Sequence, residues 1–261
     1  MTDLSAAIGF PEVALSLFLV AVGLVVSRLR RVGLEGDIAV ATVRSFAQLL
    51  AVGYVLEFIF DGHGGLTLVA LAVMVATATW TTGNRAKGVP GARVVAAVSI
   101  GTAVGATLGL LTLLDVVPAV ARAVVPLGSM VLSNAMVTSS LVMTSLRDGL
   151  ASQRREVEAR LSLGHTAREA ALPWMRSALR SGMLPIVDNT KVVGLVALPG
   201  AMTGMILAGA SPLDAIRLQL VVMYLLLGGN AFAALVAGEL SVRRLFTPHH
   251  QLIRSLRRPA P

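Results

Sequence analysis

Long, continuous runs of apolar residues alternate with short polar segments along almost the whole chain. A helix needs roughly 20 apolar residues to cross a bilayer, and most of these runs are that long. The runs are continuously apolar rather than alternating, which favours helices over strands. The pattern predicts an all-α membrane protein of one domain, with about seven transmembrane helices near residues 10–27, 38–59, 66–83, 94–114, 118–146, 183–209 and 213–240.

The composition strengthens this prediction. Hydrophobic residues make up 55% of the chain and charged residues 14%, whereas soluble domains carry about 25% charged residues. The first apolar run has no basic residue before it and no clear cleavage site of small residues. We therefore expect a retained membrane helix at this position and not a signal peptide.

Basic residues give the chain a net charge of +8 and gather on one side of the predicted membrane. They follow the first, third and fifth predicted helices and fill the C-terminal tail, whereas the opposite loops hold few. Basic loops stay cytoplasmic. We therefore expect a protein of the cytoplasmic (inner) membrane whose N-terminus lies outside and whose 148–182 segment and C-terminus lie in the cytoplasm. This distribution explains the charge without nucleic acid, which we do not expect as a partner.

Sequence patterns typical of enzymes are missing. The lysines Lys87 and Lys191 do not follow a glycine, so the Gly-Lys-[Ser/Thr] element of nucleotide-binding loops does not occur. The chain has no cysteine, and its four histidines form no His-x-x-x-His pair, so no metal ligands can be assigned. We expect neither an enzyme active site nor a cofactor bound by this chain.

The 148–182 segment is too long to be a simple connection and carries an amphipathic pattern. Apolar residues recur there at steps of three and four, with charges between them, which predicts helix; they are Val157, Leu161, Ala167, Ala171, Met175 and Leu179. Gly164 interrupts the pattern, so we expect two short helices that meet at a turn. Such a segment either lies on the bilayer surface or docks onto a partner.

Several predicted spans carry polar residues that are costly in lipid. Arg44 and Gln48 are four residues apart in the second span and therefore share a helix face. Arg44 either extends to the inner interface or faces the bundle interior and binds an anionic group. In the fourth span, Gly101, Gly105 and Gly109 form a ridge that suits close helix packing within the chain or between protomers.

Polar and methionine residues also occur in the later spans. Asn134 in the fifth span must face protein or water, and Met136 either packs or offers a thioether to a metal ion. In the sixth span Asp188 and Lys191 are placed to pair, and Pro199 with the glycines after it permits a kink or an unwound turn. Broken spans of this kind often line transport sites.

The segment Glu158-Ala159-Arg160, followed by Gly164 and Leu172-Pro173, is similar to the EAA loop of bacterial ABC-importer permeases. In that family the loop forms a coupling helix that docks onto the ATPase subunit. Arginine replaces the second alanine here, and the Leu-Pro pair comes a few residues early.

Three further stretches resemble the FetB/YbbM permease family, to which plant aluminium-tolerance permeases also belong. They are Ser133-Asn134-Ala135-Met136, the motif at 198–212 and the ending at 246–252. The resemblance implies a half-transporter of an ABC system, with about seven spans, that pairs with a separate ATPase. Members are linked to iron export, to aluminium tolerance and to nucleotide-sugar movement.

The resemblance implies that the coupling residues are Glu156, Glu158, Arg160, Gly164, His165 and Arg168. We expect the translocation pathway to be lined by Arg44, Gln48, Asn134, Met136, Asp188, Asn189, Met202, Thr203 and Met205. The implied transporter is a homodimer of this permease in the lipid bilayer with a separate FetA-like ATPase, which binds the ATP and Mg. Its implied cargo is a metal ion, with iron export as the specific expectation.

Other classes of protein stay open at this point. An ABC permease for an organic anion or a nucleotide sugar fits the same resemblance. A secondary transporter driven by an ion gradient needs a proton or ion relay, for which Asp188 is the plausible carboxylate. A membrane scaffold that assembles an ATPase without moving a cargo is the third alternative.

Overall fold

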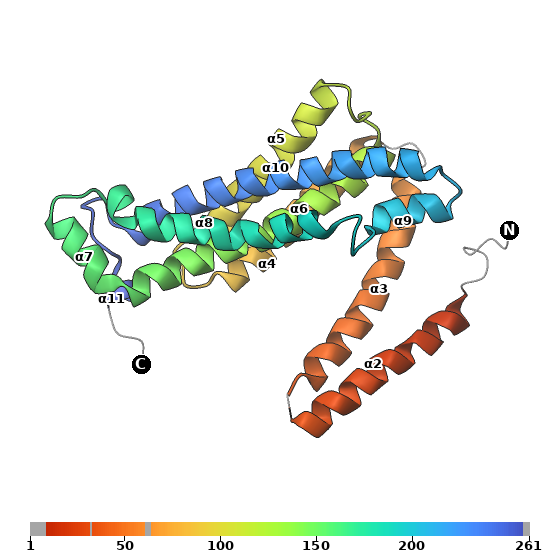
Figure 1. Cartoon of the computed structure of the whole chain (residues 1–261), viewed down its shortest axis with the longest axis horizontal. Helices are drawn as coiled ribbons and strands as arrows, with labels where there is room; N and C mark the ends of the chain where they lie inside the picture. Colours follow the sequence, from red (N-terminus) through yellow and green to blue (C-terminus); the bar gives the residue numbers. More distant parts are fainter. Residues whose placement is uncertain (1–8, 32, 61–63, 258–261) are drawn as a thin grey trace.

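The computed structural model describes residues 9–31, 33–60 and 64–257, which form helices and contain no strand. Figure 1 shows α7, α11 and the C-terminus at one end of the molecule and α9 at the other. The helices are α2 (Phe10–Arg30), α3 (Glu35–Phe60), α4 (Gly64–Arg85), α5 (Ala92–Leu113), α6 (Ala121–Ser152), α7 (Arg154–Ser162), α8 (Ala167–Val192), α9 (Gly200–Leu207), α10 (Pro212–Leu245) and α11 (Arg254–Arg257).

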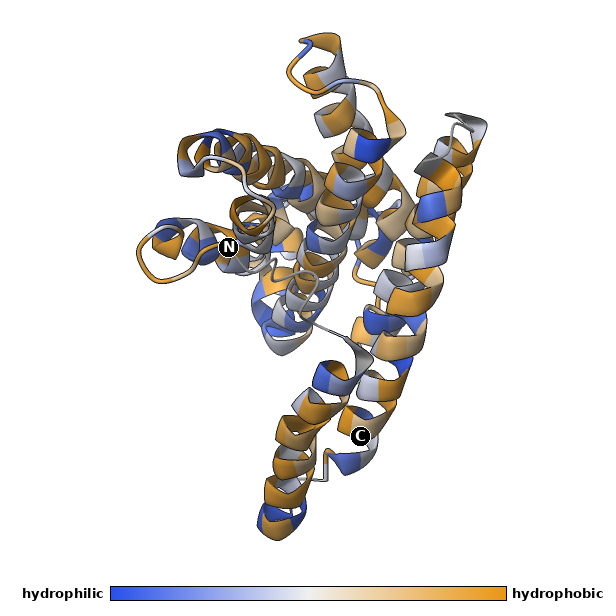
Figure 2. Cartoon of the chain, turned by 90° about the vertical axis from the view of Figure 1, so that its right-hand side faces the viewer, coloured by the Kyte–Doolittle hydropathy of each residue, from blue (hydrophilic) through white to orange (hydrophobic). Residues whose placement is uncertain are grey.

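Within the described ranges, 6 helices are long and apolar enough to cross a membrane, namely α2, α3, α4, α5, α6 and α10. Each coincides with a predicted span, which confirms the all-α membrane class. Hydrophobic residues cover much of the surface of these helices (Figure 2). With 32 and 34 residues, α6 and α10 are longer than the roughly 20 residues that a bilayer requires. They therefore extend beyond it.

The remaining predicted span, 183–209, differs from the structure in its boundaries. Its first part belongs to α8, which begins at Ala167 and therefore includes much of the expected docking segment. The helix stops at Val192, Gly194 adopts a left-handed φ of 83°, and α9 starts at Gly200. The expected interruption is thus present, and its non-helical residues are 193–199, which end at the proline of the Pro-Gly pair. Pro199 is the N-cap of α9.

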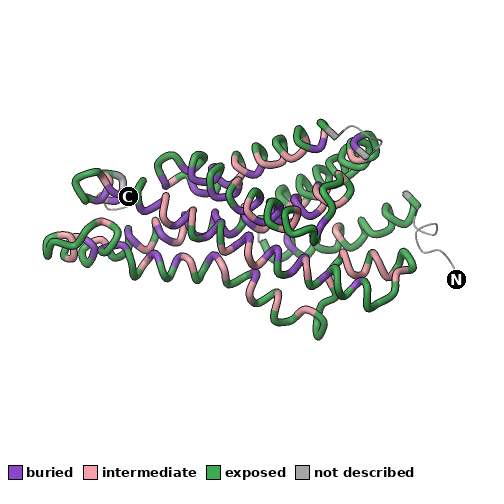
Figure 3. Tube along the Cα trace, turned by 90° about the horizontal axis from the view of Figure 1, so that it is seen from above, coloured by how far each residue is buried: buried purple, intermediate pink, exposed green. Residues whose placement is uncertain are grey.

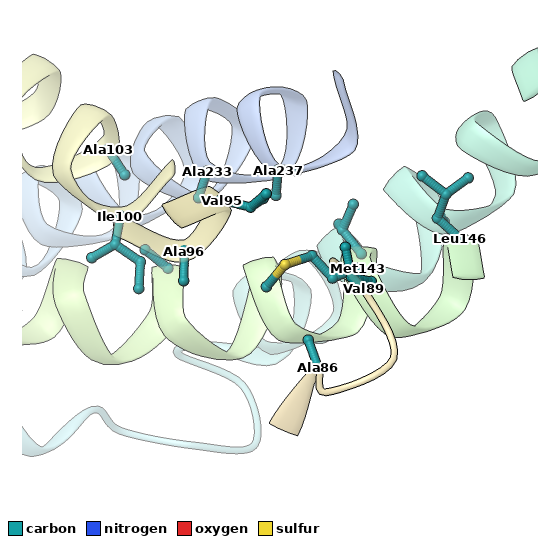
Figure 4. Close-up of a cluster of buried hydrophobic side chains, with 14 of the residues drawn as sticks. Ala86, Val89, Val95, Ala96, Ile100, Ala103, Met143, Leu146, Ala233 and Ala237 are labelled. Atoms are coloured by element: carbon teal, nitrogen blue, oxygen red, sulfur yellow. The ribbon is translucent and has the colours of Figure 1, made fainter. Parts of the chain in front are cut away.

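The helices α4, α5, α6, α8 and α10 form one bundle with a continuous apolar core. Figure 4 shows Ile100 and Met143 in this core near the alanines of α5 and α10, and Leu146 further along α6. Small residues let the helix backbones approach closely. A Cβ atom at Gly182 of α8 would lie 3.1 Å from the Thr138 carbonyl oxygen of α6. The side chain of Met143 is fully buried, so it packs in the core.

The glycine ridge of α5 does not serve this packing. Added Cβ atoms at Gly101, Gly105 and Gly109 would meet nothing within 4 Å. Of the two alternatives, close packing of the ridge within the chain is therefore not found, because the other helices of the bundle approach different faces of α5. Packing of the ridge between protomers stays a prediction.

The hairpin of α2 and α3 lies apart from the bundle (Figure 1) and is coloured almost entirely as exposed in Figure 3. In the most apolar part of each helix, 6% of α2 residues and 0% of α3 residues are buried. The Ser27 hydroxyl donates a 2.9 Å hydrogen bond to Glu35 and closes the turn between the two helices. Arg44 and Gln48 are exposed on α3, away from the bundle of their own chain.

Candidate functional site

Helix α7 is a short surface helix at one end of the bundle, held by one buried residue. This residue, Val157, lies on the side of α7 that faces the bundle and is fully buried. Two ion pairs at i,i+4 spacing run along its surface, Arg154–Glu158 at 2.8 Å and Arg160–Glu156 at 2.9 Å. The predicted coupling residues Glu156, Glu158 and Arg160 therefore lie together, with their charges already paired. Both carboxylates stay exposed, so a partner can still bind them alongside these pairs.

The turn between α7 and α8 depends on Gly164, as the sequence predicted. Its φ of 91° lies in the left-handed region, which residues with a Cβ rarely adopt. Leu163 beside it is 80% exposed, although it is a large apolar side chain. A partner that binds this end would cover this side chain and remove its apolar surface from water. The sequence analysis did not single out Leu163, which lies outside the three- and four-residue apolar pattern of the segment.

A capping box starts α8. The backbone N–H and hydroxyl of Thr166 each donate a 2.8 Å hydrogen bond to the Glu169 carboxylate. The hydroxyl also accepts the Glu169 N–H at 3.3 Å. The backbone bond first, and then the hydroxyl bond and nearby His165 and His250, lower the pKa of Glu169 below 4.5. Such reciprocal bonding satisfies amides that the first helical turn leaves free.

We expect replacement of Thr166 by alanine to destabilise the start of α8 by about 1 kcal/mol, the usual contribution of an N-cap. Because the folded state lowers the pKa of Glu169, the cap stabilises the turn above pH 4.5 and loses this contribution as the pH falls further. Hydrogen exchange of the amides at 163–169 measures both effects. Faster exchange in the variant at pH 7 and a smaller difference from the parent at low pH are expected, because the Thr166 hydroxyl still accepts the Glu169 N–H when the carboxyl is protonated. Equal exchange at pH 7 would contradict the assignment of the cap.

The C-terminal segment, residues 246–253, folds back beneath this turn. Phe246 and Leu252 form an antiparallel bridge, and both are buried. The Ala167 N–H donates to Nδ1 of His250 at 3.2 Å. Arg154, Glu158 and His165 on one side, and residues 249–252 on the other, line a pocket of about 760 Å³. The described residues contain no group of three or more His, Asp or Glu able to hold a metal ion.

Glu239 of α10 connects the start of α8 to the end of α10. Its two oxygens lie 3.3 Å from Arg168 and 3.4 Å from Arg243. Arg168, predicted as a coupling residue, is thereby tied to a membrane-crossing helix. Sequence reasoning missed Glu239 as part of this end, because its partner Arg168 lies 71 positions earlier in the chain.

A buried polar contact joins α8 to α6 and α10 further along the bundle. The Thr138 hydroxyl lies 3.1 Å from Oδ1 of Asn230 and 3.3 Å from the carbonyl oxygen of Gly182. Asn230 is 1% exposed, and its Nδ2 atom has no hydrogen-bond partner among the described residues. Buried polar groups in membrane helices specify helix contacts or mark pathways.

The structure brings most of the predicted pathway residues to the far half of the bundle. Helices α6 and α8 run in opposite directions (Figure 1), and Thr138 meets Gly182, so Asn134 lies at the level of residues 186–188. Asp188 pairs with Lys191 at 3.2 Å, as expected, and both are exposed. Asn189 lies beside them, and across the break α9 carries the half-buried Met202, Thr203 and Met205.

Other predicted pathway residues lie elsewhere or are already engaged. The Asn134 amide donates to the Met130 carbonyl at 2.9 Å, and Met136 packs against the apolar core. Arg44 and Gln48 are on the separate hairpin. Their assignment to the pathway stays a prediction that requires a second molecule beside α3.

The fold defines a multi-pass helical membrane protein with one structured, charged end. The family model described as "Uncharacterised protein family (UPF0014)" matches residues 10–246, and the chain belongs to this family. No solved structure matches the chain.

Named relatives match over most of their length. The "UPF0014 membrane protein STAR2" of Oryza sativa subsp. japonica is 42% identical, over 89% of this chain and 82% of that protein. "Protein ALUMINUM SENSITIVE 3" of Arabidopsis thaliana is 39% identical, over 94% of this chain and 90% of that protein. The "Probable iron export permease protein FetB" of Escherichia coli (strain K12) is 34% identical, over 93% of this chain and 94% of that protein. These relatives support a transporter permease.

Proposed function

We propose that the chain is the permease subunit of an ABC-type transporter in the cytoplasmic membrane. Two copies would work with two copies of a separate ATPase, which binds ATP and Mg and carries out hydrolysis. The printed name of the Escherichia coli relative supports the permease role. The single observation that carries the coupling is that α8 runs without interruption from the Gly164 turn to the broken segment at 193–199.

The proposed mechanism uses this continuity. The ATPase binds α7 and the exposed Leu163, and its closure moves the turn. Because the capping box and the Glu239 ion pairs hold the start of α8, the whole helix follows. Its other end leads into residues 193–199 and α9, where a movement changes access to the residues of the proposed pathway.

The proposed cargo is a metal ion, moved outward. The name of one relative specifies iron export, and the name of another refers to aluminium. On this chain, the half-buried Met202, Thr203 and Met205 on α9 supply thioether and hydroxyl ligands beside the break. Transient, exchangeable ligands of this kind suit a cargo that must leave again.

Co-purification from the native host tests the proposed partner. The detergent-extracted chain is expected to retain a soluble protein with a Gly-Lys-[Ser/Thr] loop. Combined charge reversal, Glu158→Arg with Arg160→Glu, is expected to reduce the retained amount at least about tenfold, a loss of about 1.4 kcal/mol. Stimulation of that ATPase by added iron in liposomes then tests the cargo.

The opposite end of the bundle offers a matched control. Asp214 and Arg217 form an exposed ion pair of 3.1 Å at the start of α10, and reversal of both charges should leave ATPase retention unchanged. Isolation of the chain without an ATPase, under conditions that preserve other complexes, would overturn the proposal. Gradient-driven transport that Asp188→Asn abolishes would then support the secondary-transporter alternative.

A further inference from the structure

The connection between α4 and α5 forms a small basic pocket that the proposed function does not use. Gly83, Asn84, Val89 and Gly91–Arg93, together with Lys87, line a volume of about 300 Å³. The described residues 64–114, which contain both helices and their connection, include no aspartate or glutamate. The pocket therefore has a positive charge that no acidic side chain of these helices offsets.

The packing beneath the pocket holds this connection in place. Ala86 is 1% exposed and Val89 is 3% exposed, so the loop is anchored in the core. Figure 4 shows both side chains directed toward the bundle near Met143. Gly88 lies directly against the Arg147 side chain of α6, where a Cβ atom would clash. A loop anchored on its inner side presents Lys87 outward, where it is exposed.

Arg93 is positioned by two contacts. Its guanidinium group lies 4.0 Å from the centre of the Trp80 ring, and Nη2 donates to Oδ1 of Asn84 at 3.4 Å. Gly83 makes room for this arrangement, because a Cβ atom there would lie 3.2 Å from Cα of Arg93. The cation therefore has a defined position above α4 at the rim of the pocket.

The surroundings of the pocket indicate a lipid interface. Trp80 is 57% exposed, and tryptophan is typical of the interface between membrane and water. Val69 and Val73, also exposed, share its face of α4 and form an apolar stripe that leads from the pocket into the membrane. A ligand with an anionic head and apolar chains matches both features.

We propose that this pocket binds the phosphate headgroup of an anionic phospholipid, with Lys87 and Arg93 contacting the phosphate. The acyl chains lie along the Val69–Trp80 face of α4. Basic pockets between transmembrane helices bind anionic headgroups in this way, through charge attraction at the membrane surface.

Fluorescence quenching tests the proposal on the full-length chain. Trp80 and Trp174 are the two tryptophans, so Trp174→Phe leaves Trp80 as the reporter. Brominated phosphatidylglycerol is expected to quench Trp80 at lower mole fraction than brominated phosphatidylcholine. Lys87→Gln should reduce this preference about fivefold, the effect of one basic residue near an anionic surface. Adding Arg93→Gln should remove the preference.

Arg30→Gln is the matched control, because it removes one exposed charge at the end of α2 and should leave the preference unchanged. Equal quenching by the two lipids, or a preference that Lys87→Gln does not alter, would overturn the proposal. Displacement of the lipid by millimolar inorganic phosphate at constant ionic strength would show a site for free phosphate, and would also overturn it.

Discussion

Gly182→Leu is expected to destabilise the bundle by about 3 kcal/mol, near the upper end of the usual cost of overpacking. At this position α8 meets the backbone of α6, because a Cβ atom would lie 3.1 Å from the Thr138 carbonyl oxygen. A larger side chain must push the helices apart and also separate Thr138 from Asn230. The midpoint of thermal unfolding in detergent measures the effect.

Gly228→Leu is the control for this prediction. It introduces the same side chain into another membrane helix, where nothing lies within 4 Å of the new Cβ atom. Its effect should stay within about 0.5 kcal/mol, as for other surface substitutions. Similar midpoints for the two variants would show that the close contact of α6 and α8 does not support the fold.

Gly164→Pro is expected to reduce binding of the ATPase at least about tenfold, or about 1.4 kcal/mol. Proline fixes φ near −65°, whereas Gly164 has a φ of 91°. Proline also removes the N–H that donates to the Leu161 carbonyl at 3.1 Å. The turn must therefore rearrange and displace Leu163. Retention of the ATPase on the immobilised permease measures the loss.

Gly209→Pro is a matched control at the opposite end of the molecule. Gly209 has the same φ of 91° and donates a 3.0 Å hydrogen bond to Ile206, three residues earlier. The local strain in the two variants is therefore comparable, but the connection between α9 and α10 lies at the end of the molecule opposite α7 (Figure 1). Equal loss of ATPase binding in both would refute the docking role of the Gly164 turn.

Sequence patterns predicted the membrane helices and the amphipathic segment because hydrophobic periodicity is a local property. Val157, Ala171 and Met175, which carry the apolar pattern of that segment, are buried against the rest of the chain. The continuity of α8 was not predictable in this way, because Pro173 and Pro185 normally interrupt a helix. Both lie inside α8, where tertiary packing of its small residues compensates for the missing hydrogen bonds.

The candidate site could be predicted only where it depends on residues close together in the sequence. Residue type and spacing identified the charges of α7 and the glycine turn. Contacts between distant positions, such as Arg168 with Glu239 and Ala167 with His250, depend on how the helices pack. The orientation of Arg44 was equally hidden, because α3 is apolar on every side and its pattern does not distinguish lipid from protein.

The close contact at Gly182 divides α8 into two arms around a pivot. At 1.5 Å per residue, the arm from Ala167 to Gly182 is about 22 Å long, and the arm from Gly182 to Val192 is about 15 Å long. A rigid helix that tilts about this point moves its two ends in opposite directions. The end at Val192 then travels about two-thirds as far as the end at Ala167. In the transporter proposed above, a pull of the ATPase on the turn would therefore displace the broken segment in the opposite direction, as alternating access between the two sides of the membrane requires.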